Sequence, residues 1–134
     1  MIWLLDTTAV SAAMRYEPAI VSFLRDNPPG TIRTAAPVVA ELEYGIQRLA
    51  ANSRKRILLD EQKRRLLGKI GILDWLPEAS VAFGAIKAHL EATGSMIDDF
   101  DIAIAAIARC HGAEVVTANL VHFTRVPHLT VRHW

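Results

Sequence analysis

The fold class is indicated most directly by DDFDIAIAAIARCHGAEVVT, residues 98–117. Its first part predicts a helix, because Asp98 can cap the N-terminus and Gly112 can end the helix after His111. This helix is so apolar that most of its surface must be packed against other elements. Ala113 to Thr117 then predicts a short buried strand. A covered helix that leads into a buried strand is typical of a parallel sheet with helices packed on it.

Outward from this segment, the chain continues to alternate between strands and helices. Short apolar runs predict further strands at residues 1–5, 31–36, 70–73 and 129–132, the last of them at an edge of the sheet. Caps and helical periodicity predict helices at residues 8–14, 18–24, 37–50, 53–67 and 77–93. In the last of these helices, Val81, Ile86 and Leu90 are expected to form the buried stripe. The alternation predicts an α/β fold with a central parallel sheet and helices on both faces.

Length and composition predict a single domain spanning residues 1–134, and the apolar content of 51% is enough for a sizeable core. The net charge of +1 indicates no polyanionic partner. The distribution of charge is more informative, because residues 48–69 hold eight basic residues and two acids, a net of +6. The rest of the chain carries a net of −5. This split predicts a cationic face and a separate acidic site.

One cysteine, Cys110, excludes an internal disulfide and a zinc site built from several cysteines. Its apolar surroundings predict a buried thiol. Asp6 interrupts the opening apolar run, which argues against a signal peptide, and no uncharged run is long enough to span a bilayer. We therefore expect a soluble, cytoplasmic protein with no membrane partner.

Polar residues follow two of the predicted strands. Asp6 comes directly after residues 1–5, and Thr117 to Asn119 end the strand that begins at Ala113. Functional side chains of open parallel sheets gather beyond the carboxyl ends of the strands, so Asp6 and Asn119 converge if these strands are neighbours. A helix N-cap for Asp6 and a turn residue for Asn119 remain alternative interpretations.

Two further acids lie on helices. Glu41 flanks the buried stripe of its helix, and Gly45, one turn later, leaves open space beside the carboxylate. Asp101 opens the apolar helix, with the small Ala105 and Ala106 one turn beyond it, and is expected to face inward. The alternatives are an ordinary exposed glutamate and, for Asp101, a partner of Asp98 in a capping box.

Three acids on separate segments at one edge of a sheet suit a hard divalent cation such as Mg²⁺ or Mn²⁺, which prefers oxygen ligands. Without a metal, clustered carboxylates repel one another and raise at least one pKa. A bound metal acidifies water and stabilises charge on a phosphoryl group. The pattern therefore predicts metal-dependent phosphodiester hydrolysis.

These motifs, in this order, resemble the PIN-domain ribonucleases, and among them the VapC-type toxins of bacterial toxin–antitoxin modules. The matching segments cover nearly the whole chain: Leu5-Asp6-Thr7, Ala40-Glu41-Leu42-Glu43-Tyr44-Gly45, residues 94–106, residues 116–123, Arg125-Val126-Pro127 and Trp134. The resemblance implies a three-layer α/β/α sandwich and an endoribonuclease that is the toxin of a type II pair.

The resemblance also implies the residues of the site. Asp6, Glu41 and Asp101 would hold Mg²⁺ or Mn²⁺, and Thr7 and Thr117 would orient the acids or a metal-bound water. Two positions depart from the family's pattern: Asn119 stands where many members have a fourth catalytic acid, and Thr8 stands where asparagine is more usual. The implied partners are RNA, a VapB-like antitoxin whose tail blocks the acidic cleft, and a second copy of the chain in a homodimer.

The basic segment and the Asn119 substitution leave alternatives open. Six basic residues can track an RNA backbone, since phosphate contacts supply most of the non-specific affinity for nucleic acid: Arg54, Lys55, Arg56, Lys63, Arg64 and Arg65. The same residues can form a solvated helix face or contact the antitoxin. Of the five histidines, only His122 is close to the predicted cleft. With Asn119 in place of an acid, a catalytically silent binding module of the same fold is the alternative function.

Overall fold

The computed structural model describes all residues, 1–134, and contains five parallel strands in one sheet. The strands lie in the order β3-β2-β1-β4-β5, with bounds Gly71–Leu73, Ile32–Ala35, Ile2–Leu5, Ala113–Val116 and Val131–Arg132. The neighbouring strands β1 and β4 lie at the centre, where Leu4 and Leu5 of β1 pair with Val115 and Val116 of β4. From β1 the chain adds β2 and β3 on one side, and from β4 it adds β5 on the other. The carboxyl ends of β1 and β4 therefore form the switch point at which open parallel sheets place their functional residues.

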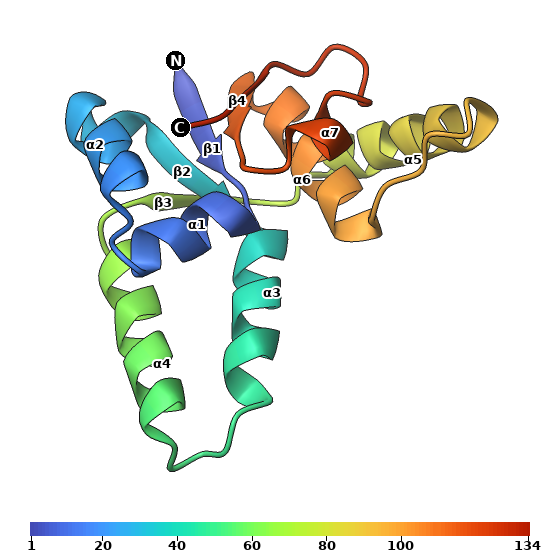
Figure 1. Cartoon of the computed structure of the whole chain (residues 1–134). Helices are drawn as coiled ribbons and strands as arrows, with labels where there is room; N and C mark the ends of the chain where they lie inside the picture. Colours follow the sequence, from blue (N-terminus) through green and yellow to red (C-terminus); the bar gives the residue numbers. More distant parts are fainter.

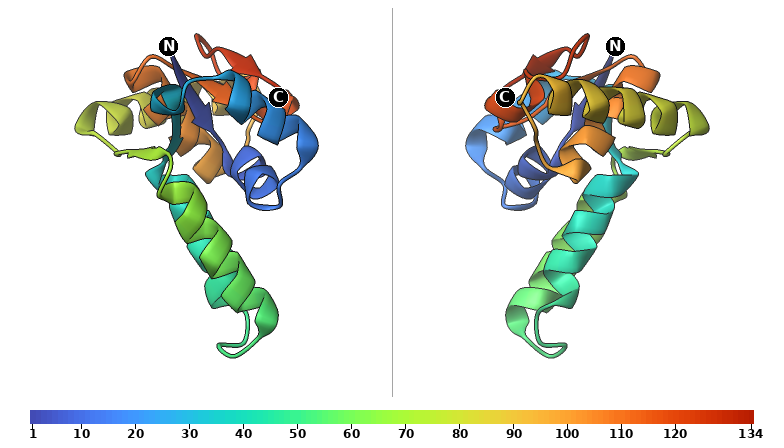
Figure 2. Two further views of the ribbon diagram at one scale, coloured as in Figure 1. Left: turned by 90° about the vertical axis from the view of Figure 1, so that its left-hand side faces the viewer. Right: turned by 90° about the vertical axis from the view of Figure 1, so that its right-hand side faces the viewer.

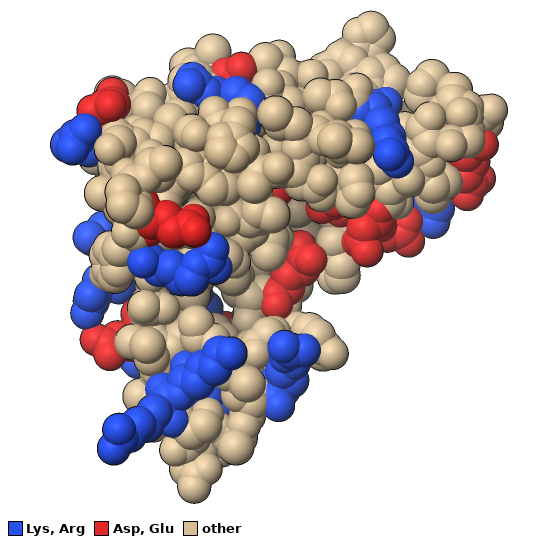
Figure 3. Space-filling model, in the orientation of Figure 1, with Lys and Arg blue, Asp and Glu red and all other residues tan.

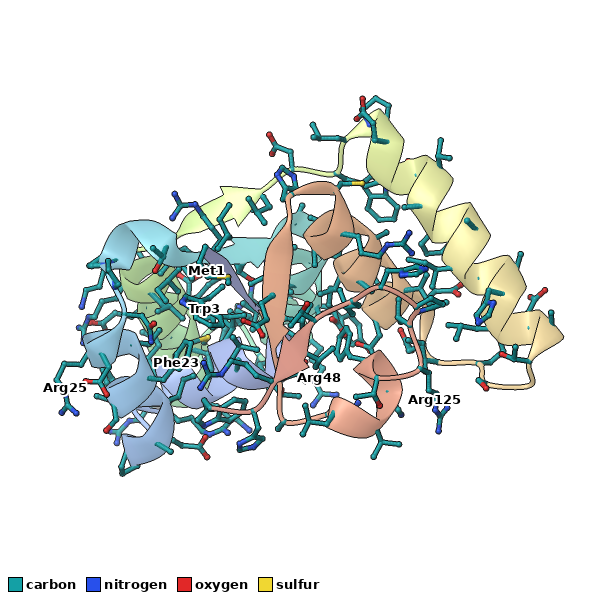
Figure 4. The ribbon with its side chains drawn as sticks, turned by 90° about the horizontal axis from the view of Figure 1, so that it is seen from above. Met1, Trp3, Phe23, Arg25, Arg48 and Arg125 are labelled. Atoms are coloured by element: carbon teal, nitrogen blue, oxygen red, sulfur yellow. The ribbon has the colours of Figure 1, made fainter.

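Seven α-helices flank the sheet (Figures 1 and 2). Seen from above, α5 and α6 lie on one side of the strands, and α1 and α2 lie on the other (Figure 4). This arrangement confirms the predicted α/β/α sandwich. The helix bounds are α1 Thr7–Met14, α2 Pro18–Asp26, α3 Ala36–Gln47, α4 Arg54–Leu67, α5 Pro77–Ala92, α6 Asp99–Cys110 and α7 Leu120–Phe123.

The centre of the core is α6, in which every residue from Ile102 to Ala108 is buried. Its ends lie where the sequence predicts them. The side chain of Asp98 accepts a hydrogen bond from the backbone N–H of Phe100, and Gly112 adopts a φ of 62° just beyond the helix. A positive φ favours glycine because it has no Cβ. The alanines let α6 pack closely against both α5 and the sheet.

Helices α3 and α4 form an antiparallel hairpin that projects away from the sheet (Figures 1 and 2). The side chain of Ser53 caps α4 by accepting a hydrogen bond from the N–H of Arg56, as its position predicts. No residue of α4 is fully buried, because the helix packs mainly against α1 and α3 at the margin of the core. The hairpin extends the surface next to the carboxyl ends of the strands.

Two packing predictions are wrong. Val81 is 77% exposed, because the inward face of α5 is formed by Ala79, Ile86 and Leu90, which share one side of the helix. Cys110 is exposed, because it occupies the last position of α6, where the helix leaves the core. None of the helices combines the length and hydropathy that a membrane span requires.

Candidate active site

Asp6 follows β1 directly and is only 2% exposed. One carboxylate oxygen, Oδ1, accepts hydrogen bonds from the backbone N–H of Ala9 at 2.9 Å and from the hydroxyl of Thr8 at 2.6 Å. The other, Oδ2, accepts one from the hydroxyl of Thr117 at 2.5 Å. Asp6 is therefore both the N-cap of α1 and a residue of the cleft, so the two interpretations of the sequence are compatible.

The surroundings of Asp6 raise its pKa. Burial is the main cause, because it disfavours the charged carboxylate, and the negative charge of Asp101 acts in the same direction. The hydrogen bonds from Thr117, Thr8 and Ala9 act in the opposite direction without offsetting the burial. Asp6 is thus a carboxylate whose charge is costly unless a cation approaches it.

Two threonine hydroxyls join the start of α1 to the loop after β4. The hydroxyl of Thr8 accepts a hydrogen bond from the backbone N–H of Ala118 at 2.9 Å while donating to Asp6. The hydroxyl of Thr117 accepts one from the N–H of Asn119 at 2.8 Å. The sequence singled out Thr117, whereas the contact made by Thr8 depends on the pairing of β1 with β4 and was not foreseen.

Glu41 reaches the same edge of the sheet from α3, which begins directly after β2. Its Oε1 accepts a hydrogen bond from the hydroxyl of Thr7 at 2.5 Å, which ties α3 to the start of α1. Burial raises the pKa of Glu41 against the effect of Thr7, and the charges of Asp101, Asp98 and Asp6 raise it further. Glu41 therefore experiences the field of both other predicted acids.

Asp101 faces inward from the first turn of α6, and its side chain is 19% exposed. Its Oδ2 lies 3.1 Å from Nδ1 of His122, which also lies 2.7 Å from Nδ2 of Asn119. Burial raises the pKa of Asp101 although His122 opposes this change, and the charge of Asp98 adds to it. Asn119 thus has its backbone near Asp6, through Thr117, and its side chain near Asp101, through His122.

The donor set of the cleft consists of oxygen atoms and one imidazole, which fits Mg²⁺ or Mn²⁺ better than a soft metal. No lysine or arginine forms an ion pair with Asp6, Glu41 or Asp101, and the one basic side chain in contact with them is His122, beside Asp101. In the arrangement seen here, no three acidic, histidine or cysteine side chains are close enough to enclose an ion. Magnesium commonly uses few protein ligands, with water and substrate phosphate completing its shell. The residues fit such a metal by chemistry and by electrostatics.

The six basic candidates of α4 differ in what they contact. Lys63 pairs with Glu43 and Asp60, Arg64 with Asp60, and Arg65 with Glu61 and the hydroxyl of Tyr16. Arg56 donates to the carbonyl of Leu49 and to Gln47. Only Arg54 and Lys55 form no hydrogen bond or ion pair within the chain. Two of the six, Lys63 and Arg56, therefore link α4 to α3 and its C-terminal turn, whereas Arg64 and Arg65 pair within α4 or with Tyr16.

Comparison with known proteins agrees with this fold. The PIN domain family model matches residues 3–129. Ribonuclease VapC2 of Haemophilus influenzae is 32% identical over 132 residues, which cover 98% of this chain and 97% of that protein. The tRNA(fMet)-specific endonuclease VapC of Salmonella typhimurium is 24% identical over 98% of this chain and 97% of that protein.

A solved structure extends the likeness to three dimensions. VapBC2 from Rickettsia felis, crystallised with a DNA fragment from its promoter, contains a chain that superposes with a TM-score of 0.87 at 28% identity. The superposition covers 100% of this chain and 99% of that one. The parallel sheet with acids beyond its carboxyl ends is thus that of a PIN domain. This chain belongs to the PIN-domain family, among its VapC-type ribonucleases.

Proposed function

We propose that this chain is a metal-dependent endoribonuclease that hydrolyses RNA phosphodiester bonds and acts as the toxin of a type II toxin–antitoxin pair. One observation carries this proposal. Three carboxylates from three separate elements share one edge of the sheet, and burial together with the charge of a neighbouring acid raises the pKa of each. With no lysine or arginine paired to any of them, and only His122 beside Asp101, they form a site suited to a divalent cation.

In this proposal Asp6, Glu41 and Asp101 hold Mg²⁺ or Mn²⁺, and Asn119 can add its carbonyl oxygen. When bound, the metal supplies an acidified water and stabilises negative charge on the phosphate. Two threonine hydroxyls hold the acids in fixed orientations, Thr117 on Asp6 and Thr7 on Glu41.

His122 contacts two groups of the proposed site through one ring nitrogen, which donates to Asp101 when it carries a hydrogen and accepts from Asn119 when it does not. Its Nδ1 lies between Asp101 and Asn119, so that movement of either side chain would change the contact with the other. His122 is thus a positioning residue in the proposal. The acids would hold the metal, and the threonine hydroxyls around them keep the carboxylates in fixed orientations.

The partners follow from the same assignment. We propose a VapB-like antitoxin whose tail blocks the acidic cleft, in line with the VapBC2 complex described above. We also propose a homodimer, acting in the cytoplasm where its RNA substrate is found. Light scattering of the purified chain, alone and with its antitoxin, tests both assemblies.

The central experiment is cleavage of a mixed RNA panel, including structured tRNA and rRNA, by purified protein in Mg²⁺ or Mn²⁺. Asp6→Asn and Asp101→Asn should each abolish cleavage, because each removes a proposed ligand charge. Asp99→Asn is the matched control: Asp99 is on the same turn as Asp101 but is exposed and paired with Lys87. It should cleave like the wild type.

Two results would contradict the proposal. If folded, antitoxin-free wild type cuts no RNA in either metal, the catalytically silent binding module becomes the better assignment. If Asp6→Asn and Asp101→Asn cut as well as the wild type, the observed cleavage belongs to a contaminant and the assigned site has no support.

A further inference from the structure

A groove of about 390 Å³ runs beside Glu41, between α1 and the α3–α4 hairpin. Glu41, Gly45 and Arg48 all line it, and their spacing of four and three residues places them on one face of α3. Arg48 lies about 10 Å along the helix axis from Glu41, since each residue advances an α-helix by about 1.5 Å. The groove thus leads from the acidic site to a basic end.

Two basic residues at this groove are free of partners within the chain. Arg48 and Lys55 line the groove and form no hydrogen bond or ion pair, whereas Lys63, Arg64 and Arg65 are all paired with acids. Figure 3 shows Lys and Arg side chains over the projecting hairpin and acidic side chains above it, next to the body of the protein. Two unpaired cations therefore lie on the groove that begins at Glu41.

Gly45 lies between the acidic and basic ends of the groove. A Cβ added at this position would meet no atom within 4 Å, so packing does not demand glycine there. Glycine in a helix interior costs about 0.5–1 kcal/mol relative to alanine. The helix therefore carries an avoidable cost at a position that lines the groove one turn from Glu41.

The rest of the groove surface is largely apolar, with Leu42, Ile46 and Leu49 from α3 and its C-terminal turn. An RNA strand offers two features that fit this surface: regularly spaced negative phosphates for the free cations, and sugars and bases that can pack on apolar side chains. A strand with one phosphate at the acids would bring a neighbouring phosphate toward Arg48.

We propose that Arg48 and Lys55 form a subsite for an RNA phosphate that flanks the scissile phosphodiester, with Gly45 as the floor over which the strand passes. The proposal rests on the endoribonuclease function proposed above and adds a substrate path to it. Arg48 and Gly45 are thereby binding residues of the enzyme. Of the six basic candidates of α4, Lys55 is the one that contributes to this subsite.

The first test compares two double variants that remove the same kinds of charge. Arg48→Ala/Lys55→Ala removes the subsite, and Arg25→Ala/Lys69→Ala is the control, since both of its residues are exposed and lie outside the groove. Arg25 points away from the body at the edge of the molecule (Figure 4). We expect the subsite variant to raise KM for a short RNA about tenfold with kcat within about twofold, a change of about 1.4 kcal/mol in binding. The control should match the wild type.

RNA binding is measured separately from cleavage, by fluorescence anisotropy in the Asp101→Asn background with EDTA present. The slope of log Kd against log salt should fall by about 0.7 if Arg48 and Lys55 share one phosphate, and by about 1.4 if each binds its own. If the slope of log Kd against log salt is the same in the subsite variant and the control, the proposed subsite is wrong. The nuclease function is judged separately, by RNA cleavage in the wild type and its loss in Asp6→Asn. If the subsite variant binds the antitoxin more weakly but binds RNA with unchanged affinity, the groove is a binding site for the protein partner. That result also overturns the proposed subsite.

A second pair of variants tests the groove without changing charge. Gly45→Leu fills the floor, and Gly84→Leu, in the middle of α5, is the control, since a Cβ added at either position meets no atom within 4 Å. Both should fold with melting temperatures at or above that of the wild type, because leucine is the better helix former. Only Gly45→Leu should weaken RNA binding. Unchanged RNA affinity in well-folded Gly45→Leu would show that no strand passes over this position.

Discussion

Replacement of Thr117 by valine tests how the protein tolerates a buried charge at Asp6. The Thr117 side chain is fully buried and donates to Oδ2 of Asp6 at 2.5 Å. Valine keeps the volume of threonine and removes the hydroxyl. A hydrogen bond to a charged group contributes about 1.5–3 kcal/mol, and its loss leaves a buried carboxylate oxygen without a donor. We expect unfolding free energy at pH 7 to fall by about 2–3 kcal/mol, which for a chain of this size lowers Tm by roughly 6–12 °C.

Thr34→Val is the matched control. Thr34 is equally buried, and its hydroxyl donates to a neutral acceptor, the carbonyl oxygen of Leu5, at 2.8 Å. The same substitution there should cost only about 1 kcal/mol, the usual net contribution of a neutral hydrogen bond. The difference between the two variants contains the effect of the Asp6 charge and that of the hydrogen bond from the N–H of Asn119, which Thr117→Val also removes. Only the first of these depends on the ionisation of Asp6.

The dependence on pH gives a sharper test. The folded-state pKa of Asp6 is raised by burial, so the folded protein binds more protons than the unfolded chain above the usual carboxyl pKa. Its contribution to stability therefore falls as pH rises through that window. Loss of the Thr117 donor raises the pKa of Asp6 further, so the destabilisation by Thr117→Val should grow as pH rises and level off once Asp6 is ionised.

Urea unfolding in EDTA from pH 5 to pH 8 measures the unfolding free energy of each variant and its dependence on pH. The destabilisation by Thr34→Val should be the same across this range. If both variants lose equal free energy, with equal dependence on pH, Thr117 does not stabilise a charged Asp6 and the electrostatic account of the cleft is wrong.

Three further predictions concern the rest of the molecule. The pKa of Asp101 is raised, so its ionised form lowers the stability of the fold. Asp101→Asn should therefore melt at a higher temperature than the wild type in metal-free buffer at neutral pH, and Mn²⁺ should no longer stabilise it. A lower melting temperature would contradict the proposed repulsion. Cys110 should react stoichiometrically with a thiol reagent in the native protein within minutes, whereas protection until unfolding would mean that it is buried. On α5, Ile86→Ala should lower the unfolding free energy by about 2–5 kcal/mol and Val81→Ala by less than about 0.5 kcal/mol; equal losses in denaturant titrations would place both on the buried face.

The sequence was sufficient to predict those features that depend on local pattern. Short apolar runs placed all five strands, and capping signals placed Asp98 and Ser53 at the starts of α6 and α4. The family and its endoribonuclease class are also confirmed by the comparisons, because acids of defined order and spacing carry that resemblance. The assignment of Asp6, Glu41 and Asp101 as metal ligands stays a prediction for the cleavage experiment.

Tertiary structure decided the features that depend on which elements become neighbours. The exposure of Cys110 and Val81 depends on where a helix leaves the core and which face it turns inward. The parallel pairing of β1 with β4 is what lets Thr8 bridge Asp6 and Ala118.

The basic segment shows most clearly which features are local to the sequence and which depend on tertiary packing. Its net charge is evident from the sequence, but the partners of each cation depend on how α3 packs beside α4. Lys63 pairs with Glu43, twenty residues earlier in the chain, whereas Lys55 remains free beside the groove. Composition and periodicity are local properties that the sequence by itself determines. The pairing of charges and the shape of a groove depend on distances across the fold, which only the packed chain sets.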